Sequence, residues 1–314
     1  MLDNNKALKQ NLMISIMFVV LAQLITGANI TTSKYLIESL PILFLVESRF
    51  IIAVFSLGAI FIFASKTHKQ REYLSIKSFS KKQWLVLIGQ ALGGGAFFNL
   101  LMMWGVKYTS ASMAGVITSS LPAMVIIFMF FMLGIKLTRR KLICVGLAVA
   151  GLFIININGV MQPKISAMNL VGDLIIFLAM VPEAMYYVLS KALPLNIKPL
   201  TASIMINIIN AILLIPFLFF LHYGFLSQLS LFEWSLIFLL GITSGLFYLF
   251  WSKGCEVIDA STSGMITALM PVFTLILSWL FLNEIISLVQ MLAMLLIIAS
   301  IFVGNWKKST RTLS

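Results

Sequence analysis

Long apolar stretches separated by short polar loops account for almost the whole chain. A helix that crosses a membrane needs about 20 mostly apolar residues. Ten stretches meet or approach that length, at residues 12–32, 41–64, 83–106, 110–133, 141–158, 169–190, 200–221, 233–252, 261–282 and 286–305. The pattern therefore predicts an all-α polytopic membrane protein with ten transmembrane helices, of which the fifth is the shortest.

Two near-copies of one phrase lie 149 positions apart in this series. The first reads Gly-Val-Ile-Thr at Gly115–Thr118, and the second reads Gly-Met-Ile-Thr at Gly264–Thr267. Each is followed at the same distance by a proline, Pro122 in the first copy and Pro271 in the second. This internal repeat indicates that the chain consists of two copies of one hydrophobic unit.

The ten stretches divide into five and five at the loop 156–168. Because five is an odd number, the two halves would enter the membrane from opposite sides. We therefore expect two inverted five-helix repeats, at residues 1–158 and 163–314. Inverted repeats are typical of secondary transporters, whose substrate site lies near the midplane where the repeats meet.

The positive charges are distributed very unevenly between the predicted loops. The chain has 22 Lys and Arg residues against 10 Asp and Glu. If the N-terminus is cytoplasmic, the outside loops hold only Lys34, Lys107 and Lys164, and Arg49 lies within a span. Such asymmetry follows the positive-inside rule and differs from the basic groove of a nucleic-acid-binding protein. It predicts cytoplasmic N- and C-termini in a cell (inner or plasma) membrane.

Composition narrows the function classes further. Hydrophobic residues make up 61% of the chain and charged residues 10%, whereas soluble domains have about 25% charged residues. The two cysteines, Cys144 and Cys255, have neither CxxC spacing nor a histidine partner, so we expect no metal, redox centre or cofactor. No HExxH or GxSxG motif is present. A membrane-embedded enzyme acting on a lipid-linked substrate is therefore the rival class rather than the preferred one.

The chain resembles the drug/metabolite transporter superfamily, specifically its EamA-type permeases. The residues that carry the resemblance are the Arg-Phe pair within Glu47–Phe50, the repeated phrase with its prolines, and Leu282–Glu284, which resembles a Gly-Glu step. In the first half Ile135 stands where the family usually has the glutamate. The resemblance implies a carrier of small metabolites, often an exporter of amino acids or related compounds.

Glu183 lies near the middle of the sixth apolar stretch, directly after Pro182. An ionisable group inside a membrane costs from about 2.5 to more than 10 kcal/mol, so it needs a reason to be there. Tyr186 and Tyr187 follow at helical spacing and suggest an aromatic-lined cavity. Burial favours the neutral form of a carboxyl group, which would let it load and release a proton. Glu183 is either a proton- or substrate-binding carboxylate or an acid paired with a fixed cation.

Arg49 is the cation within the second apolar stretch. Its guanidinium can bind a substrate carboxylate through two parallel hydrogen bonds. It can equally pair with Glu183 or reach the outer interface with its long side chain. Glu47, two positions away, faces the other side of the helix, and we expect it to be structural or to act in gating.

Other polar and aromatic residues in the spans complete the candidate site. Each can line a wet pathway or bond a neighbouring helix. The candidates for substrate or proton binding beyond Glu183, Arg49, Tyr186 and Tyr187 are Gln23, Asn29, Asn207, Asn210, Tyr248 and Trp251. The candidates for packing or hinge positions are Gly94, Pro122, Pro182 and Pro271.

Together these observations predict a secondary-active transporter that works by alternating access. We expect its partners to be a small-molecule substrate, protons and the lipid bilayer, and we expect it to export. The alternatives are an uncoupled uniporter or exchanger and, in a different class, the membrane-embedded enzyme.

Overall fold

The computed structural model describes residues 2–67, 79–134, 166–192, 197–258 and 269–305, with a few isolated positions between 139 and 150 and between 263 and 267. Every regular element within these ranges is helical. The helices with their bounds are α1 (Leu2–Leu36), α2 (Ile42–Thr67), α3 (Lys81–Gln90), η2 (Ala91–Phe97), α4 (Phe98–Tyr108), α5 (Ala111–Thr118), α6 (Leu121–Leu133), α8 (Ala167–Ala192), α9 (Pro199–Leu218), η3 (Tyr223–Gln228), α10 (Leu231–Cys255), α12 (Leu269–Leu282) and α13 (Leu288–Asn305).

Seven helical runs in the described ranges are long and apolar enough to cross a membrane. They coincide with the first four predicted spans and with the sixth, seventh and eighth. The ninth predicted span corresponds to the shorter helix α12 and the tenth to α13. The fifth, residues 141–158, lies outside the described residues apart from isolated positions. The all-helical membrane class is confirmed, and the total of ten stays a prediction.

Serine caps and breaks inside the spans shape the helices locally. Ser80 is the N-cap of α3 and Ser230 is the N-cap of α10, and each forms a capping box with the residue three positions later. A capping box provides hydrogen-bond partners for two backbone N–H groups that have none within the helix. The third span is continuous but passes through the π-helix η2, which contains Gly94. The fourth span breaks between α5 and α6, just before Pro122. Two predicted hinge positions therefore lie at irregularities of the helices.

The other two prolines of the predicted hinge set lie within helices. Pro182 is inside α8, directly before Glu183. Pro271 is the third residue of α12, where a missing backbone N–H costs little because the first turn has no partner for it.

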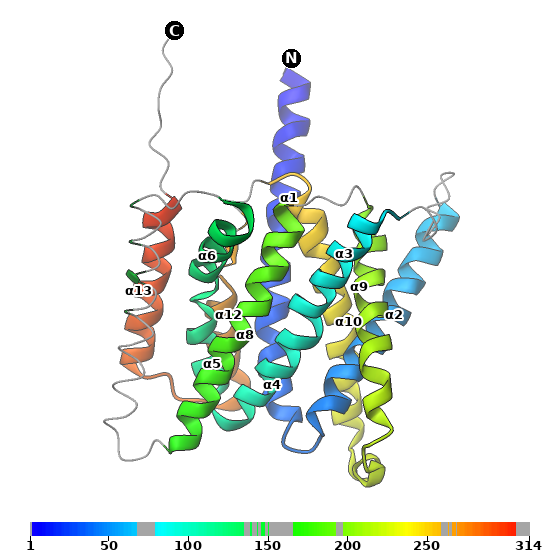
Figure 1. Cartoon of the computed structure of the whole chain (residues 1–314), viewed down its shortest axis with the longest axis vertical. Coiled ribbons are helices and arrows are strands. Elements are labelled where there is room, and N and C mark those ends of the chain that lie inside the picture. Colours follow the sequence, from blue (N-terminus) through cyan, green and yellow to red (C-terminus); the bar gives the residue numbers. More distant parts are fainter. Residues whose placement is uncertain are drawn as a thin grey trace.

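The helices run in alternating directions through the molecule (Figure 1). The N-terminal end of α1 and the C-terminal end of α13 lie on the same side. Helix α1 runs away from that side, whereas α8, the first helix after the predicted boundary between the halves, runs towards it. Helices α1 and α8, which begin the two predicted halves, therefore start on opposite sides of the molecule.

The packing of the helices follows a paired pattern. Helix α1 packs against α10 and α12, while α8 packs against α4 and α6. Two glycines make close approaches of this kind possible: a methyl group added at Gly105 would lie 2.9 Å from the Gly172 carbonyl oxygen, and one at Gly254 would lie 2.8 Å from the Ser15 carbonyl oxygen. The contact of α4 from the first predicted half with α8 from the second thus resembles the contact of α10 from the second half with α1 from the first.

Candidate functional site

A small cavity lies inside the helical bundle, between helices of the two predicted halves. Its volume is about 30 Å³, room for roughly two water molecules at about 10–15 Å³ each. Helices α1, α2, α4, α8 and α10 and the segment η2 contribute to its wall. The lining residues are Thr26, Asn29, Ile30, Arg49, Phe50, Gly94, Phe98, Asn99, Met102, Met103, Glu183, Ser244, Phe247 and Tyr248.

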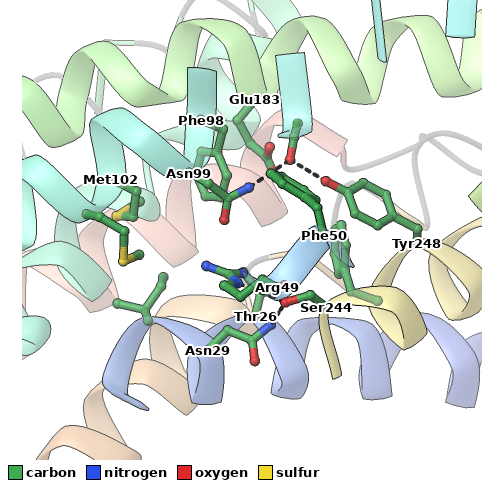
Figure 2. Close-up of a pocket in the computed structure, with 14 residues that line it drawn as sticks. Thr26, Asn29, Arg49, Phe50, Phe98, Asn99, Met102, Glu183, Ser244 and Tyr248 are labelled. Carbon is green, nitrogen blue, oxygen red and sulfur yellow. Dashed lines mark hydrogen bonds between the residues drawn. The ribbon is translucent and has the colours of Figure 1, made fainter. Parts of the chain in front are cut away.

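Arg49 is held in this cavity by its neighbour on α10. The Arg49 Nε atom donates a hydrogen bond of 2.9 Å to the Ser244 hydroxyl, which in turn donates to the Leu240 carbonyl oxygen. The Asn29 amide also donates to the Ser244 hydroxyl, at 3.4 Å. The Arg49 Nη1 atom is buried and has no hydrogen-bond partner among the residues that the structure describes. One corner of the guanidinium is thus anchored, and another is available to a ligand (Figure 2).

Glu183 reaches the same cavity from α8, and only 1% of its surface is exposed. Its Oε2 atom is buried and has no hydrogen-bond partner among the described residues. Figure 2 shows Glu183 and Arg49 approaching the cavity from different sides. Both side chains keep an unpartnered polar atom, so they share a cavity without being locked together as an ion pair.

The π-helix η2 forms the part of the wall that faces Tyr248. The Tyr248 hydroxyl donates to the Gly94 carbonyl oxygen at 2.7 Å, and the Asn99 amide donates to the Gly95 carbonyl oxygen at 2.7 Å. A π-helix leaves backbone carbonyls without their usual partners and often occurs at functional sites. Side chains of α10 and α4 therefore donate hydrogen bonds to backbone carbonyl oxygens of η2.

Glycine in η2 also brings α8 close to the cavity. A methyl group at Gly93 would lie 2.6 Å from the Pro182 carbonyl oxygen. On the other side of η2, the Asn210 side chain accepts a hydrogen bond of 2.9 Å from the Ala96 backbone N–H. The segment thus connects α8, which carries Glu183, with α9.

Several residues predicted for the site are buried beside the cavity rather than in its wall. Asn207 and Asn210 on α9 donate to backbone carbonyl oxygens four residues earlier in the same helix. Gln23 on α1 is fully buried, and its amide lies near the Tyr187 hydroxyl. Of the ten predicted binding residues, the cavity wall contains Glu183, Arg49, Asn29 and Tyr248.

An aromatic cluster accounts for three of the predicted residues outside the wall. The rings of Tyr187 and Trp251 are 4.5 Å apart, and those of Tyr186 and Tyr248 are 5.8 Å apart. The Trp251 indole donates to the Ser190 hydroxyl at 3.2 Å. Because α8 and α10 both run towards the side where α1 begins (Figure 1), the cluster lies on that side of Glu183 and Tyr248.

The sequence pattern did not single out Ser244, Met102 or Met103 as site residues. A lone serine in an apolar helix carries no signal that separates it from a packing serine. Methionines occur throughout this chain, which has 18 of them. Phe98 and Phe247, both of which line the cavity, lie 149 positions apart like the repeated phrase, so the repeat was a signal for this apolar part of the wall.

Comparison with known proteins assigns the family. The model of the EamA-like transporter family matches the chain twice, over residues 13–157 and over residues 170–306. This chain belongs to the EamA-like transporter family. It is therefore a multi-pass membrane protein of a transporter family, as the resemblance read from the sequence implied.

Relatives of this EamA protein carry transporter names as well. It is 29% identical to "uncharacterized transporter YetK" of Bacillus subtilis (strain 168), over 91% of this chain and 85% of the relative. It is 26% identical to "uncharacterized transporter YoaV" of the same organism, over 77% of this chain and 82% of the relative. A solved crystal structure with 17% identity matches 94% of this chain and 95% of that chain with a TM-score of 0.65, which supports the fold alone.

Proposed function

We propose that this EamA protein is a secondary-active transporter of small metabolites that carry a carboxylate, such as amino acids or related compounds. It works by alternating access around the cavity between its halves, is driven by protons and exports its substrate. Its N- and C-termini are on the cytoplasmic side of the cell membrane. The preference for export comes from the family resemblance, and the orientation comes from the distribution of Lys and Arg between the loops.

One observation carries the proposal. Arg49 from the first half and Glu183 from the second line one buried cavity, and the Nη1 atom of the former and the Oε2 atom of the latter have no partner among the described residues. Ionisable groups kept inside a membrane and facing a cavity mark substrate and ion pathways. The Arg49 guanidinium matches a carboxylate, and Glu183 can bind either a proton or the positive group of a substrate.

The relation between the halves supports the alternating-access part of the proposal. Helices α1 and α8 run in opposite directions (Figure 1), and the contact of Gly105 with α8 has a counterpart in the contact of Gly254 with α1. Two separate family matches cover the two halves. These observations favour inverted repeats, in which one half rocks against the other around a fixed site.

The size of the cavity supports a cycle with a closed state. A volume of about 30 Å³ is too small for an amino acid, since it corresponds to roughly two waters. The aromatic cluster of Tyr186, Tyr187 and Trp251 lies on one side of the cavity residues Glu183 and Tyr248 (Figure 1). Substrate entry therefore requires the halves to separate, and the described conformation corresponds to the contracted form.

Transport in proteoliposomes tests the proposal. Metabolites that raise the melting temperature of the purified protein are first selected and then measured for counterflow and for uphill movement driven by a proton gradient. We expect Glu183→Gln to abolish proton-driven transport while the protein stays in the membrane. Asp173→Asn is the matched control, because Asp173 is also a buried carboxylate of α8 but lies outside the cavity wall. Unaltered proton-driven transport in Glu183→Gln would remove this residue from the mechanism.

A further inference from the structure

Glu47 is a second fully buried carboxylate, and it does not line the cavity. Its side chain is 0% exposed, and neither carboxylate oxygen has a hydrogen-bond partner among the described residues. It lies on α2 two positions before Arg49, so the two side chains point to roughly opposite faces of the helix. Arg49 faces the cavity and Ser244. It therefore does not form an ion pair with Glu47 on the opposite face of α2.

The helices packed against α2 offer Glu47 no compensating charge. Helix α2 packs against α9, α10 and α4, and α9 has no titratable side chain. Among the described residues of the other neighbours, no titratable side chain donates a hydrogen bond to Glu47. The titratable residues of α10 are Glu233, which binds Ser39 and Ser230, Tyr248, which binds Gly94, Lys253, which lies over Phe18, and Cys255. Those of α4 are Lys107 and Tyr108. The segment η3, which meets Phe44 of α2, has Tyr223, and the Tyr223 hydroxyl donates to the Leu218 carbonyl oxygen.

An ionised carboxylate in such surroundings is strongly disfavoured. Burying a charge without a partner or hydrogen bonds costs far more than burying the neutral acid. In the contracted conformation Glu47 therefore holds a proton. It is the sixth residue of α2, about 8 Å along the axis from the first residue of that helix, so a modest opening of the helix packing would expose it to water.

We propose that Glu47 is a proton-binding site of the transport cycle that is separate from the substrate cavity. When the halves separate on the side of the α1–α2 loop, the Glu47 carboxylate takes a proton from water there. When they close, Glu47 is buried as the neutral acid. The proton returns to water when a later conformation wets the site from the other side, so only an O–H bond of the carboxyl group forms and breaks.

This role differs from that of Glu183 in a measurable way. A proton on Glu183 occupies a group in the cavity wall and so affects substrate binding directly. A proton on Glu47 leaves the cavity unchanged, and substrate and proton can therefore be bound together. The inference rests on the proposed proton-driven transport. Glu47 would couple proton movement to substrate movement without contacting the substrate.

Two measurements on the intact protein test the inference. In proteoliposomes, Glu47→Gln, which imitates the protonated acid, should keep counterflow within about twofold of the wild type and lower substrate-driven proton movement by at least about tenfold. Ser48→Ala, the neighbouring substitution at a half-buried residue whose hydroxyl donates to the Leu45 carbonyl oxygen of the same helix, should change neither. If Glu47→Gln moves protons with the wild-type ratio to substrate, the inference is wrong.

The second measurement does not depend on transport. The infrared carbonyl band of protonated carboxyl groups should be weaker at neutral pH in both Glu47→Gln and Glu47→Met than in the wild-type protein, by the contribution of one carboxyl group, since Glu183 is buried as well. One variant suffices if the other fails to fold. Identical spectra would overturn the inference. If instead the band is weaker in the variants but the wild type moves substrate without protons, the proposed proton coupling fails while the buried neutral acid stands.

Discussion

At the scale of single residues, a hydrogen bond to a neighbouring helix sets how Arg49 is presented to the cavity. Its Nε atom is bonded to Ser244 on α10, and Ser244 is itself fixed by the Leu240 carbonyl oxygen. An anchored guanidinium loses less freedom when it binds a ligand, because its orientation is already set. A lysine at this position would keep the charge but lose both the anchor and the planar pair of donors.

We predict that Arg49→Lys raises KM for a carboxylate substrate by about tenfold, which corresponds to about 1.4 kcal/mol. Ser244→Ala should raise KM by a smaller factor, because it removes the anchor and leaves the guanidinium. Initial rates of counterflow against substrate concentration measure both. An unchanged KM in Arg49→Lys would show that the guanidinium does not bind the substrate.

At the scale of helical elements, the turn between α4 and α5 is held by two charged residues. The Lys34 ammonium donates 2.8 Å hydrogen bonds to the Val106 and Thr109 carbonyl oxygens at the end of α4. The Glu284 carboxylate accepts hydrogen bonds from the Ala111 and Ser112 backbone N–H groups at the start of α5. A cation at a helix C-terminus and an anion at an N-terminus both match the helix dipole. Glu284 thereby fastens the second half to the first.

We predict that Glu284→Ala lowers stability by about 1 kcal/mol or more, as the loss of a helix N-cap does. Glu256→Ala is the matched control, because Glu256 is an exposed glutamate at the end of α10. The melting temperature in detergent should fall for the first variant and stay near the wild-type value for the second. Equal melting temperatures would mean that the Glu284 contact contributes nothing to stability.

The close helix contacts give a second prediction at this scale. A methyl group at Gly105 or at Gly254 meets a backbone oxygen of the facing helix, which cannot move aside without shifting that helix. Gly105→Ala and Gly254→Ala should each destabilise the protein by about 1–3 kcal/mol, as overpacking does. Gly58→Ala is the control, since nothing lies within 4 Å of the added methyl group. A loss of melting temperature in the control equal to that in the two variants would contradict the packing argument.

At the scale of the whole molecule, the proposed inverted repeats fix which loops share a side. The loop between α1 and α2 and the segment η3 lie on the side opposite to the start of α1 (Figure 1). With the N-terminus cytoplasmic, Ser39 and Ser227, both exposed, face the outside. Lys81 at the start of α3 is exposed and faces the cytoplasm.

We predict that an impermeant thiol reagent added to intact cells labels Ser39→Cys and Ser227→Cys but not Lys81→Cys. The native cysteines Cys144 and Cys255 are first replaced by serine so that each variant has one thiol. Labelling of Lys81→Cys alone would reverse the orientation. Labelling of Ser39→Cys without Ser227→Cys would break the relation between the halves.

The sequence predicted the helices and the two charged residues of the cavity because both leave strong local signals. Long apolar stretches have few other structures open to them in a membrane, and Arg49 and Glu183 stand out because charge there is rare. Local signals do not show which helices meet. Tyr186, Tyr187 and Trp251 follow the cavity residues of the same helices at helical spacing, yet their rings pack in an aromatic cluster. Ser244 was missed because its role comes from a contact with Arg49, which lies 195 positions away in the sequence.

The central claim is that one cavity, lined by both halves, opens to each side of the membrane in turn. Thr26 lines that cavity (Figure 2), so Thr26→Cys in the cysteine-free background reports its access. We predict that an impermeant thiol reagent reaches this cysteine from outside in intact cells and from the cytoplasmic side in inside-out vesicles, and that substrate slows both reactions. Reaction from one side only, whatever the substrate and proton gradient, would contradict alternating access.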